Sequence, residues 1–221
     1  MTLSDTSSPA TAGTLFKVAL ACIAVIAGFV LVDVAFFAGE ESFKREGGGL
    51  ETISALLYFV AIAVFFALAP ARVWLPLFQV PALMALFAMR EFDMDKAFTH
   101  HGIMSLKQYT RDNPPLTEKL ISGAVALFAL YVLYRVVRYG GPAAWRALQQ
   151  RELWPWFGVL AGVLVVGAKS VDGLGRKMLD FGIVISDDLD LVAGTAEEIA
   201  EAFIPVCAIL AIVSRWKGRS Q

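Results

Sequence analysis

The sequence predicts an all-α integral membrane protein, a six-transmembrane-helix bundle with short amphipathic interfacial segments. Of its 221 residues, 57% are hydrophobic and 18% are charged, whereas a soluble domain averages about 45–50% and 25%. Six apolar runs are long enough, two of them only just, to cross about 30 Å of hydrocarbon. They cover residues 15–38, 50–68, 73–92, 121–137, 154–171 and 196–213. The formal net charge of −1 excludes a strongly basic nucleic-acid-binding protein.

The first five runs have recognisable limits. Residues 1–14 are rich in Ser, Thr, Ala, Gly and Pro and are predicted to form a disordered tail. The run 15–38 exceeds the 7–15 apolar residues of a signal peptide, which favours a retained helix. Pro70 closes the second run, and Pro155 suits the first turn of the fifth helix. Glycines at 47–49 and 140–141 mark loops.

The sixth run begins with Thr195-Ala196-Glu197-Glu198, the pattern of a capping box, in which Glu198 serves the helix start. A single domain is therefore expected over residues 15–213, followed by a basic tail over 214–221. Two amphipathic segments, 142–152 and 177–191, are expected to lie at the membrane surface or over the bundle.

Charge divides sharply between the two ends of this bundle. Six crossings place both termini on one side, where nine Lys and Arg residues face two carboxylates, a net charge of +7. The opposite side carries ten basic residues and eighteen carboxylates, a net charge of −8. Nine of those ten have an acidic residue within four positions, so unpaired positive charge gathers with the termini. We therefore expect cytoplasmic termini in a plasma membrane such as the bacterial inner membrane.

The acidic end contains the predicted ion-paired polar site. Ionised groups within a membrane span are costly and tend to pair in the bundle interior. Lys169 is expected to pair with Asp33 or Glu201. Alternating charges after residue 169 indicate either a helical stripe or a turn at Gly173 and Gly175. The members of this site are Asp33, Glu51, Arg90, Lys169, Asp172, Arg176, Glu197 and Glu201.

A divalent metal site is a second hypothesis for the same end. Glu91 and Asp95 are four residues apart, Asp93 lies between them, and His100 and His101 follow. Carboxylates one turn apart can chelate a divalent cation, and imidazoles can add nitrogen ligands. The spacing matches no established metal motif, and a solvated helix end with internal ion pairs explains the same residues.

Three functions are compatible with these patterns. The first is binding or transport of a cation, metal ion or cationic solute in the acidic site. The second is a metal-dependent intramembrane enzyme acting on a lipid or lipid-linked substrate. The third is an accessory protein whose outer loops contact a partner. The sequence lacks the G-x-S-x-G, H-E-x-x-H and phosphate-loop motifs, which limits the kinds of enzyme that it could be. Whether the chain is an enzyme therefore stays open.

Overall fold

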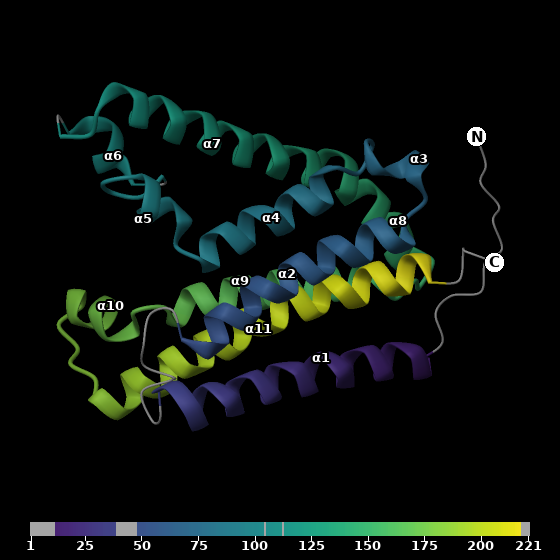
Figure 1. Ribbon diagram of the computed structural model, residues 1–221, viewed down its shortest axis with the longest axis horizontal. Coiled ribbons are helices and arrows are strands. Elements are labelled where there is room, and N and C mark those ends of the chain that lie inside the picture. Colours follow the sequence, from purple (N-terminus) through teal and green to yellow (C-terminus); the bar gives the residue numbers. More distant parts are fainter. Residues whose placement is uncertain (1–11, 39–47, 104, 112, 218–221) are drawn as a thin grey trace.

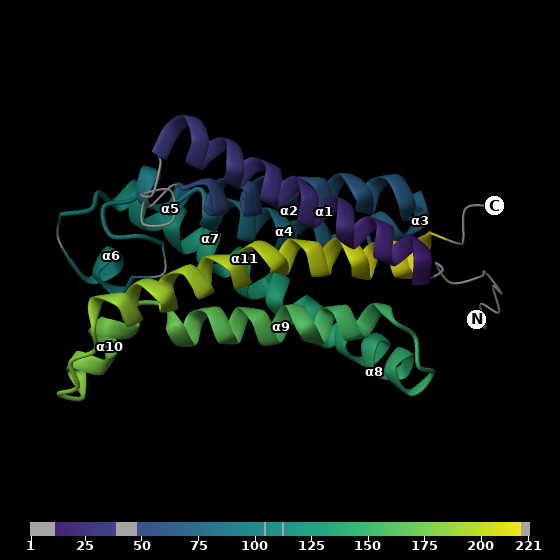
Figure 2. The ribbon, with the colours of Figure 1, turned by 90° about the horizontal axis from the view of Figure 1, so that it is seen from below.

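The computed structural model describes residues 12–38, 48–103, 105–111 and 113–217, with the side chains of 37, 38, 95 and 96 excepted. Every secondary-structure element in this part of the chain is a helix. The all-helical prediction is therefore confirmed. Figures 1 and 2 show α1, α2, α4, α7, α9 and α11 extending between the two ends of the molecule at differing tilts, with the short helices α3 and α8 at one end and α5, α6 and α10 at the other.

Four helices are long and apolar enough to cross a membrane. They cover Ala12–Phe36, Gly49–Leu68, Leu116–Gln149 and Trp154–Val171. The first comprises α1 (Ala12–Asp33) and the start of a π-helical turn (Val34–Ala38), and the second is α2 (Gly49–Leu68). The third comprises α7 (Leu116–Arg135), a second π-helical turn (Val136–Gly140) and α8 (Gly141–Gln149), and the fourth is α9 (Trp154–Val171). These four overlap four of the predicted spans, but the third continues through Gly140 and Gly141, where a loop was predicted. The first begins at Ala12, inside the predicted tail 1–14, whose residues 1–11 lie outside the described part of the chain.

The predicted span 73–92 is broken. It begins as α3 (Ala71–Trp74), turns through residues 75–78, and resumes as α4 (Gln79–Glu91). Pro76 has no amide hydrogen, and its carbonyl oxygen accepts a hydrogen bond from Arg135 Nη2 at 2.9 Å, so the helix ladder is interrupted there. At about 1.5 Å per residue, α4 is only about 20 Å long.

The predicted sixth span is part of a longer helix, α11 (Asp187–Trp216). Ser186 caps it by accepting a hydrogen bond from the Leu189 amide, and Asp187 and Asp188 place negative charge in its first turn. The predicted capping box at residues 195–198 is therefore wrong. Thr195 lies inside the helix and donates its hydroxyl hydrogen to the Leu191 carbonyl, which leaves Glu198 without a capping role.

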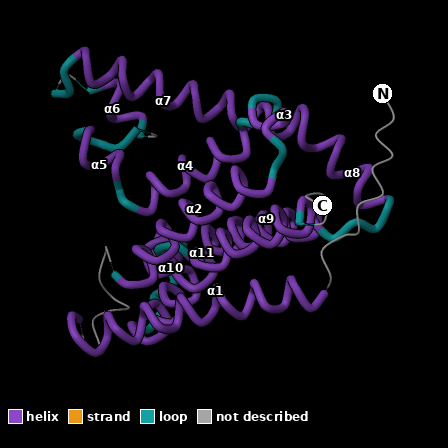
Figure 3. The backbone as a smooth tube through the Cα atoms, turned by 45° about the vertical axis from the view of Figure 1, so that its right-hand side comes forward, coloured by secondary structure: helices purple, strands orange, loops and turns teal. Residues whose placement is uncertain are grey.

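The helix α11 lies at the centre of the bundle. Its main packing partners are α9 and α2, and α2 also packs on α4. Figure 3 shows α9 and α11 side by side, with α1 on one side and α4 followed by α7 on the other. The C-terminal half of α11 buries Ile209, Ile212 and Trp216 against residues of α2 such as Phe65.

Three short helices lie at the acidic end. They are α5 (Met94–Phe98), α6 (Leu106–Thr110) and α10 (Leu174–Asp180). The predicted surface segment 142–152 coincides largely with α8, whereas the predicted segment 177–191 divides between α10 and the first turns of α11. Asp190 accepts a hydrogen bond from the Gly175 amide at 2.8 Å. This bond holds α10 against the start of α11.

Candidate functional site

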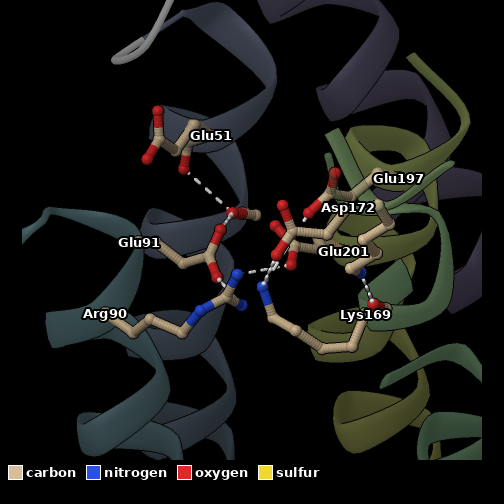
Figure 4. A network of polar contacts seen from close by, with 9 residues as sticks. Glu51, Arg90, Glu91, Lys169, Asp172, Glu197 and Glu201 are labelled. Carbon is tan, nitrogen blue, oxygen red and sulfur yellow. Dashed lines mark hydrogen bonds and ion pairs between the residues drawn. The ribbon is translucent and has the colours of Figure 1, made fainter. Parts of the chain in front are cut away.

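A polar cavity of about 320 Å³ lies between the ends of α2, α4 and α9 and the first half of α11. Seven carboxylate residues and two basic residues line it, together with Ser54 and Gly194. The carboxylates are Glu51, Glu91, Asp93, Asp172, Glu197, Glu198 and Glu201, and the basic residues are Arg90 and Lys169. Figure 4 shows Arg90 and Lys169 reaching toward the middle of the cavity from opposite walls.

Arg90 joins two helices by holding a carboxylate on each. Its Nη1 lies 3.1 Å from Glu91 Oε1 on α4, and its Nη2 lies 2.6 Å from Glu201 Oε1 on α11. The Glu91 side chain is only 2% exposed, and its other oxygen accepts a hydrogen bond from the Ser54 hydroxyl of α2 at 2.6 Å. Burial of a carboxylate is costly without such partners. The Arg90 cluster therefore fixes α2, α4 and α11 relative to one another.

Lys169 forms the second cluster. Its Nζ lies 2.7 Å from Asp172 Oδ2 and 3.9 Å from Glu197 Oε1. Glu201, one of its two predicted partners, instead pairs with Arg90. The other predicted partner, Asp33, packs closely against Gly49 at the start of α2. A Cβ atom built on Gly49 would lie only 2.9 Å from Asp33 Oδ2. The nearest carboxylate of Lys169 is therefore only three residues away along the chain, and Glu201 pairs across the bundle with Arg90 rather than with Lys169.

The pair between Lys169 and Asp172 predicts a measurable pH dependence. The hydrogen bond from Lys169 holds the pKa of the Asp172 carboxyl below its usual value, although partial burial opposes this shift. A lowered pKa stabilises the folded state above the unfolded pKa, and this contribution is lost as pH falls through the folded pKa. The Asp172 side chain is 38% exposed, so the effect is at most about 1 kcal/mol.

We therefore expect Asp172→Asn to lower the free energy of unfolding slightly at neutral pH. The difference from wild type should shrink below about pH 4, where the carboxyl of the unfolded chain is largely protonated. Denaturant unfolding of both proteins between pH 3 and pH 7 would measure it, a range chosen around the ordinary carboxyl pKa of about 4. A difference that stays constant across this range would contradict the assignment.

The charged stripe after α9 is interrupted by a turn at residues 172–173. α9 ends at Val171, and Gly173 adopts a left-handed conformation with φ +57° before α10 begins. The Arg176 side chain folds back over Gly173. A Cβ atom built on Gly173 would lie only 3.0 Å from Arg176 Nη2. The predicted turn is therefore present at Gly173, whereas Gly175 and the later charged residues of the stripe lie within α10. Glu51, in the first turn of α2, also lines the cavity.

The proposed metal ligands do not gather. Glu91 is bound by Arg90 and Ser54, whereas His100 contacts Glu118 at the start of α7 through its amide and Nδ1. The amide of His101 donates to Gln108, which in turn donates to Glu118. In the described part of the chain, no three His, Cys, Asp or Glu residues are placed to hold a metal ion. Asp93 lines the cavity, and the side chain of Asp95 lies outside the described residues.

Three residues that sequence reasoning missed contribute polar groups at this end. Ser54 lies one turn after Glu51 and binds Glu91. The Tyr58 hydroxyl, one turn further, is buried and has no hydrogen-bond partner among the described residues. The same holds for Glu198 Oε2, which is also buried without such a partner. The spacings of three residues from Glu51 to Ser54 and four from Ser54 to Tyr58 place all three on one face of α2, which was a usable signal for Ser54 and Tyr58.

No known protein family, curated protein or solved structure matches this chain. The function must therefore be inferred from the geometry and charge of the cavity.

Proposed function

We propose that the chain is a six-span membrane protein with its cavity on the outer side. Four helices meet the length and apolarity expected of spans. The two other long helices, α4 and α11, are packed between these four in the bundle. At 30 residues, α11 is about 45 Å long, more than enough to cross the hydrocarbon core. The start of α1 and the end of α11 lie at the basic end. Lys and Arg favour the cytoplasmic side, so the acidic cavity faces outward.

The cavity, in this proposal, binds a small cationic solute. The observation that carries it is the Glu198 carboxylate, whose Oε2 is buried and without a hydrogen-bond partner among the described residues. Arg90 and Lys169 each hold two other carboxylates of the cavity. A buried carboxylate oxygen with no donor is costly, and a bound cation would supply the missing donor or charge.

Size and charge both support a cationic solute. The lining residues carry seven acidic groups against two basic ones, and clefts of one sign concentrate counter-ions. The volume of about 320 Å³ falls at the lower end of the range for small-molecule pockets, about 300–1,000 Å³. An ammonium group fits this lining, because its hydrogens can bond several carboxylate oxygens at once.

The chain beyond the cavity favours binding over conduction. From Trp154 to Ala168, α9 has no charged residue, and α11 has none between Glu201 and Arg215. A charged solute crossing the basic half of the bundle would therefore meet apolar walls, at a high desolvation cost. The cavity is proposed as a closed-ended site that binds or senses the solute at the outer face.

The test is a thermal-shift titration of the detergent-purified protein with spermidine, ethylammonium, Mg²⁺ and Ca²⁺ at constant ionic strength. We expect saturable stabilisation by an organic ammonium ion, about 2.7 kcal/mol at a hundredfold excess over Kd. Glu198→Gln should remove most of this stabilisation, because an amide keeps the shape and loses the charge.

Asp180→Asn is the matched control. Asp180 is exposed at the end of α10, so its substitution removes one negative charge from the same end without changing the cavity lining. It should leave the ligand-induced shift unchanged. Equal shifts for wild type and Glu198→Gln, or no shift with any of the four cations, would contradict the proposal.

A further inference from the structure

A second cavity, apolar and of about 390 Å³, lies between α4, α9 and α11 and reaches the end of α7. Aliphatic and aromatic side chains dominate its walls, among them Leu83, Phe87, Phe157, Val165, Ile204 and Ala208. Two glycines of α9, Gly158 and Gly162, also line it, and a Cβ added to either would meet no atom within 4 Å. The groove is thus an open volume along the wall of α9.

The length of the groove corresponds to one leaflet of a bilayer. Along α11 its lining runs from Ile204 to Trp216, which at about 1.5 Å per residue is about 18 Å. Half of a hydrocarbon core of about 30 Å is about 15 Å. One acyl chain of the leaflet at the basic end therefore matches the groove in both polarity and length.

A positive charge lies where the groove meets the basic end. Arg215 lines the groove, and its guanidinium carbon lies 4.4 Å from the centroid of the Trp154 ring and 5.0 Å from that of Trp216. Cation–π contacts with both rings hold the guanidinium in place. Tryptophan is typical of the membrane interface, and a guanidinium binds phosphate oxygens in pairs.

We propose that this groove binds an anionic phospholipid from the leaflet at the basic end. One acyl chain occupies the apolar channel along α9 and α11, and the phosphate contacts Arg215. Basic residues between membrane helices on the cytoplasmic side favour anionic head groups, and this end of the chain carries the net charge of +7. The lipid site rests on the membrane insertion and orientation proposed above, but it is separate from the acidic cavity, so lipid binding and cation binding can fail independently.

The experiment is native mass spectrometry of the full chain in detergent, titrated with phosphatidylglycerol or phosphatidylcholine. We expect one phosphatidylglycerol to bind wild type roughly tenfold more tightly than phosphatidylcholine. Gly162→Leu fills the groove and should weaken binding of both lipids by roughly tenfold. Arg215→Gln should weaken phosphatidylglycerol alone, because it removes the charge and leaves the channel open.

Gly167→Leu is the matched control for the groove. It lies on the same helix, a Cβ there also meets no atom within 4 Å, and Gly167 does not line the groove. This variant should bind both lipids as wild type does. Unchanged lipid affinity in a folded Gly162→Leu protein would overturn the proposal. A wild-type dimer that Gly162→Leu dissociates, with lipid binding unaffected, would also overturn it, because the occupant would then be a second copy of the chain.

Discussion

Replacing Arg90 with Met is expected to lower the free energy of unfolding by roughly 3 kcal/mol. The substitution leaves Glu91 and Glu201 close together without their shared cation. Breaking a buried ion pair by removing one partner costs about 3–5 kcal/mol. The Arg90 side chain is 42% exposed, so solvent screening places the loss near the lower limit. Chemical denaturation of the detergent-solubilised protein would measure it.

A double-mutant cycle separates the charge effect from loss of packing. The variant Arg90→Met with Glu201→Gln should be more stable than Arg90→Met alone, because only one of the two carboxylates remains charged. Cation binding gives an independent readout, since Arg90→Met leaves seven acidic lining groups against Lys169 alone. The variant should therefore bind the organic ammonium ion more tightly than wild type. Equal stabilities for Arg90→Met and the double variant would show that the ion pair contributes little.

Much of the fold could be predicted from the sequence, since apolar length and punctuation are local properties. The span predicted at 154–171 coincides with α9, and Gly49–Leu68 lies within one residue of its prediction. The break at residues 75–78 could not be predicted by apolarity alone. Its residues are almost all apolar, and the turn depends on Pro76 and on the distant Arg135, which bonds its carbonyl.

The composition of the site was more predictable than its pairing. All eight predicted members lie at one end of the bundle, but Lys169 and Arg90 have partners that depend on how each helix is rotated. One residue of shift turns a side chain by about 100°, and apolar periodicity does not fix rotation that finely in a helix that is apolar all round. Glu198 was hidden for a different reason. The sequence around residues 195–198 resembles a capping box, which assigned Glu198 to the start of a helix, whereas α11 in fact starts at Asp187.

Replacing Phe65 with Ala is expected to cost roughly 3 kcal/mol of unfolding free energy. The Phe65 side chain is fully buried between α2 and α11, and its ring contacts Trp216 edge to face at a centroid distance of 5.4 Å. Phe→Ala in a packed core costs about 3–5 kcal/mol, mostly through lost contacts and the cavity left behind. Because lipid and detergent are themselves apolar, the hydrophobic effect adds little, and the stabilisation from Phe65 comes mainly from packing contacts. We therefore expect a loss at the lower end of this range.

The same substitution should also weaken binding of phosphatidylglycerol in the groove. Trp216 is held between Phe65 and the guanidinium of Arg215, so a cavity behind its ring lets both groups move. Phe59→Ala is the matched control, because Phe59 is 48% exposed on the same helix and does not line the groove. It should change stability by less than about 1 kcal/mol and leave lipid binding intact. If Phe65→Ala loses stability yet keeps the preference for phosphatidylglycerol, Arg215 does not depend on Trp216 for its position.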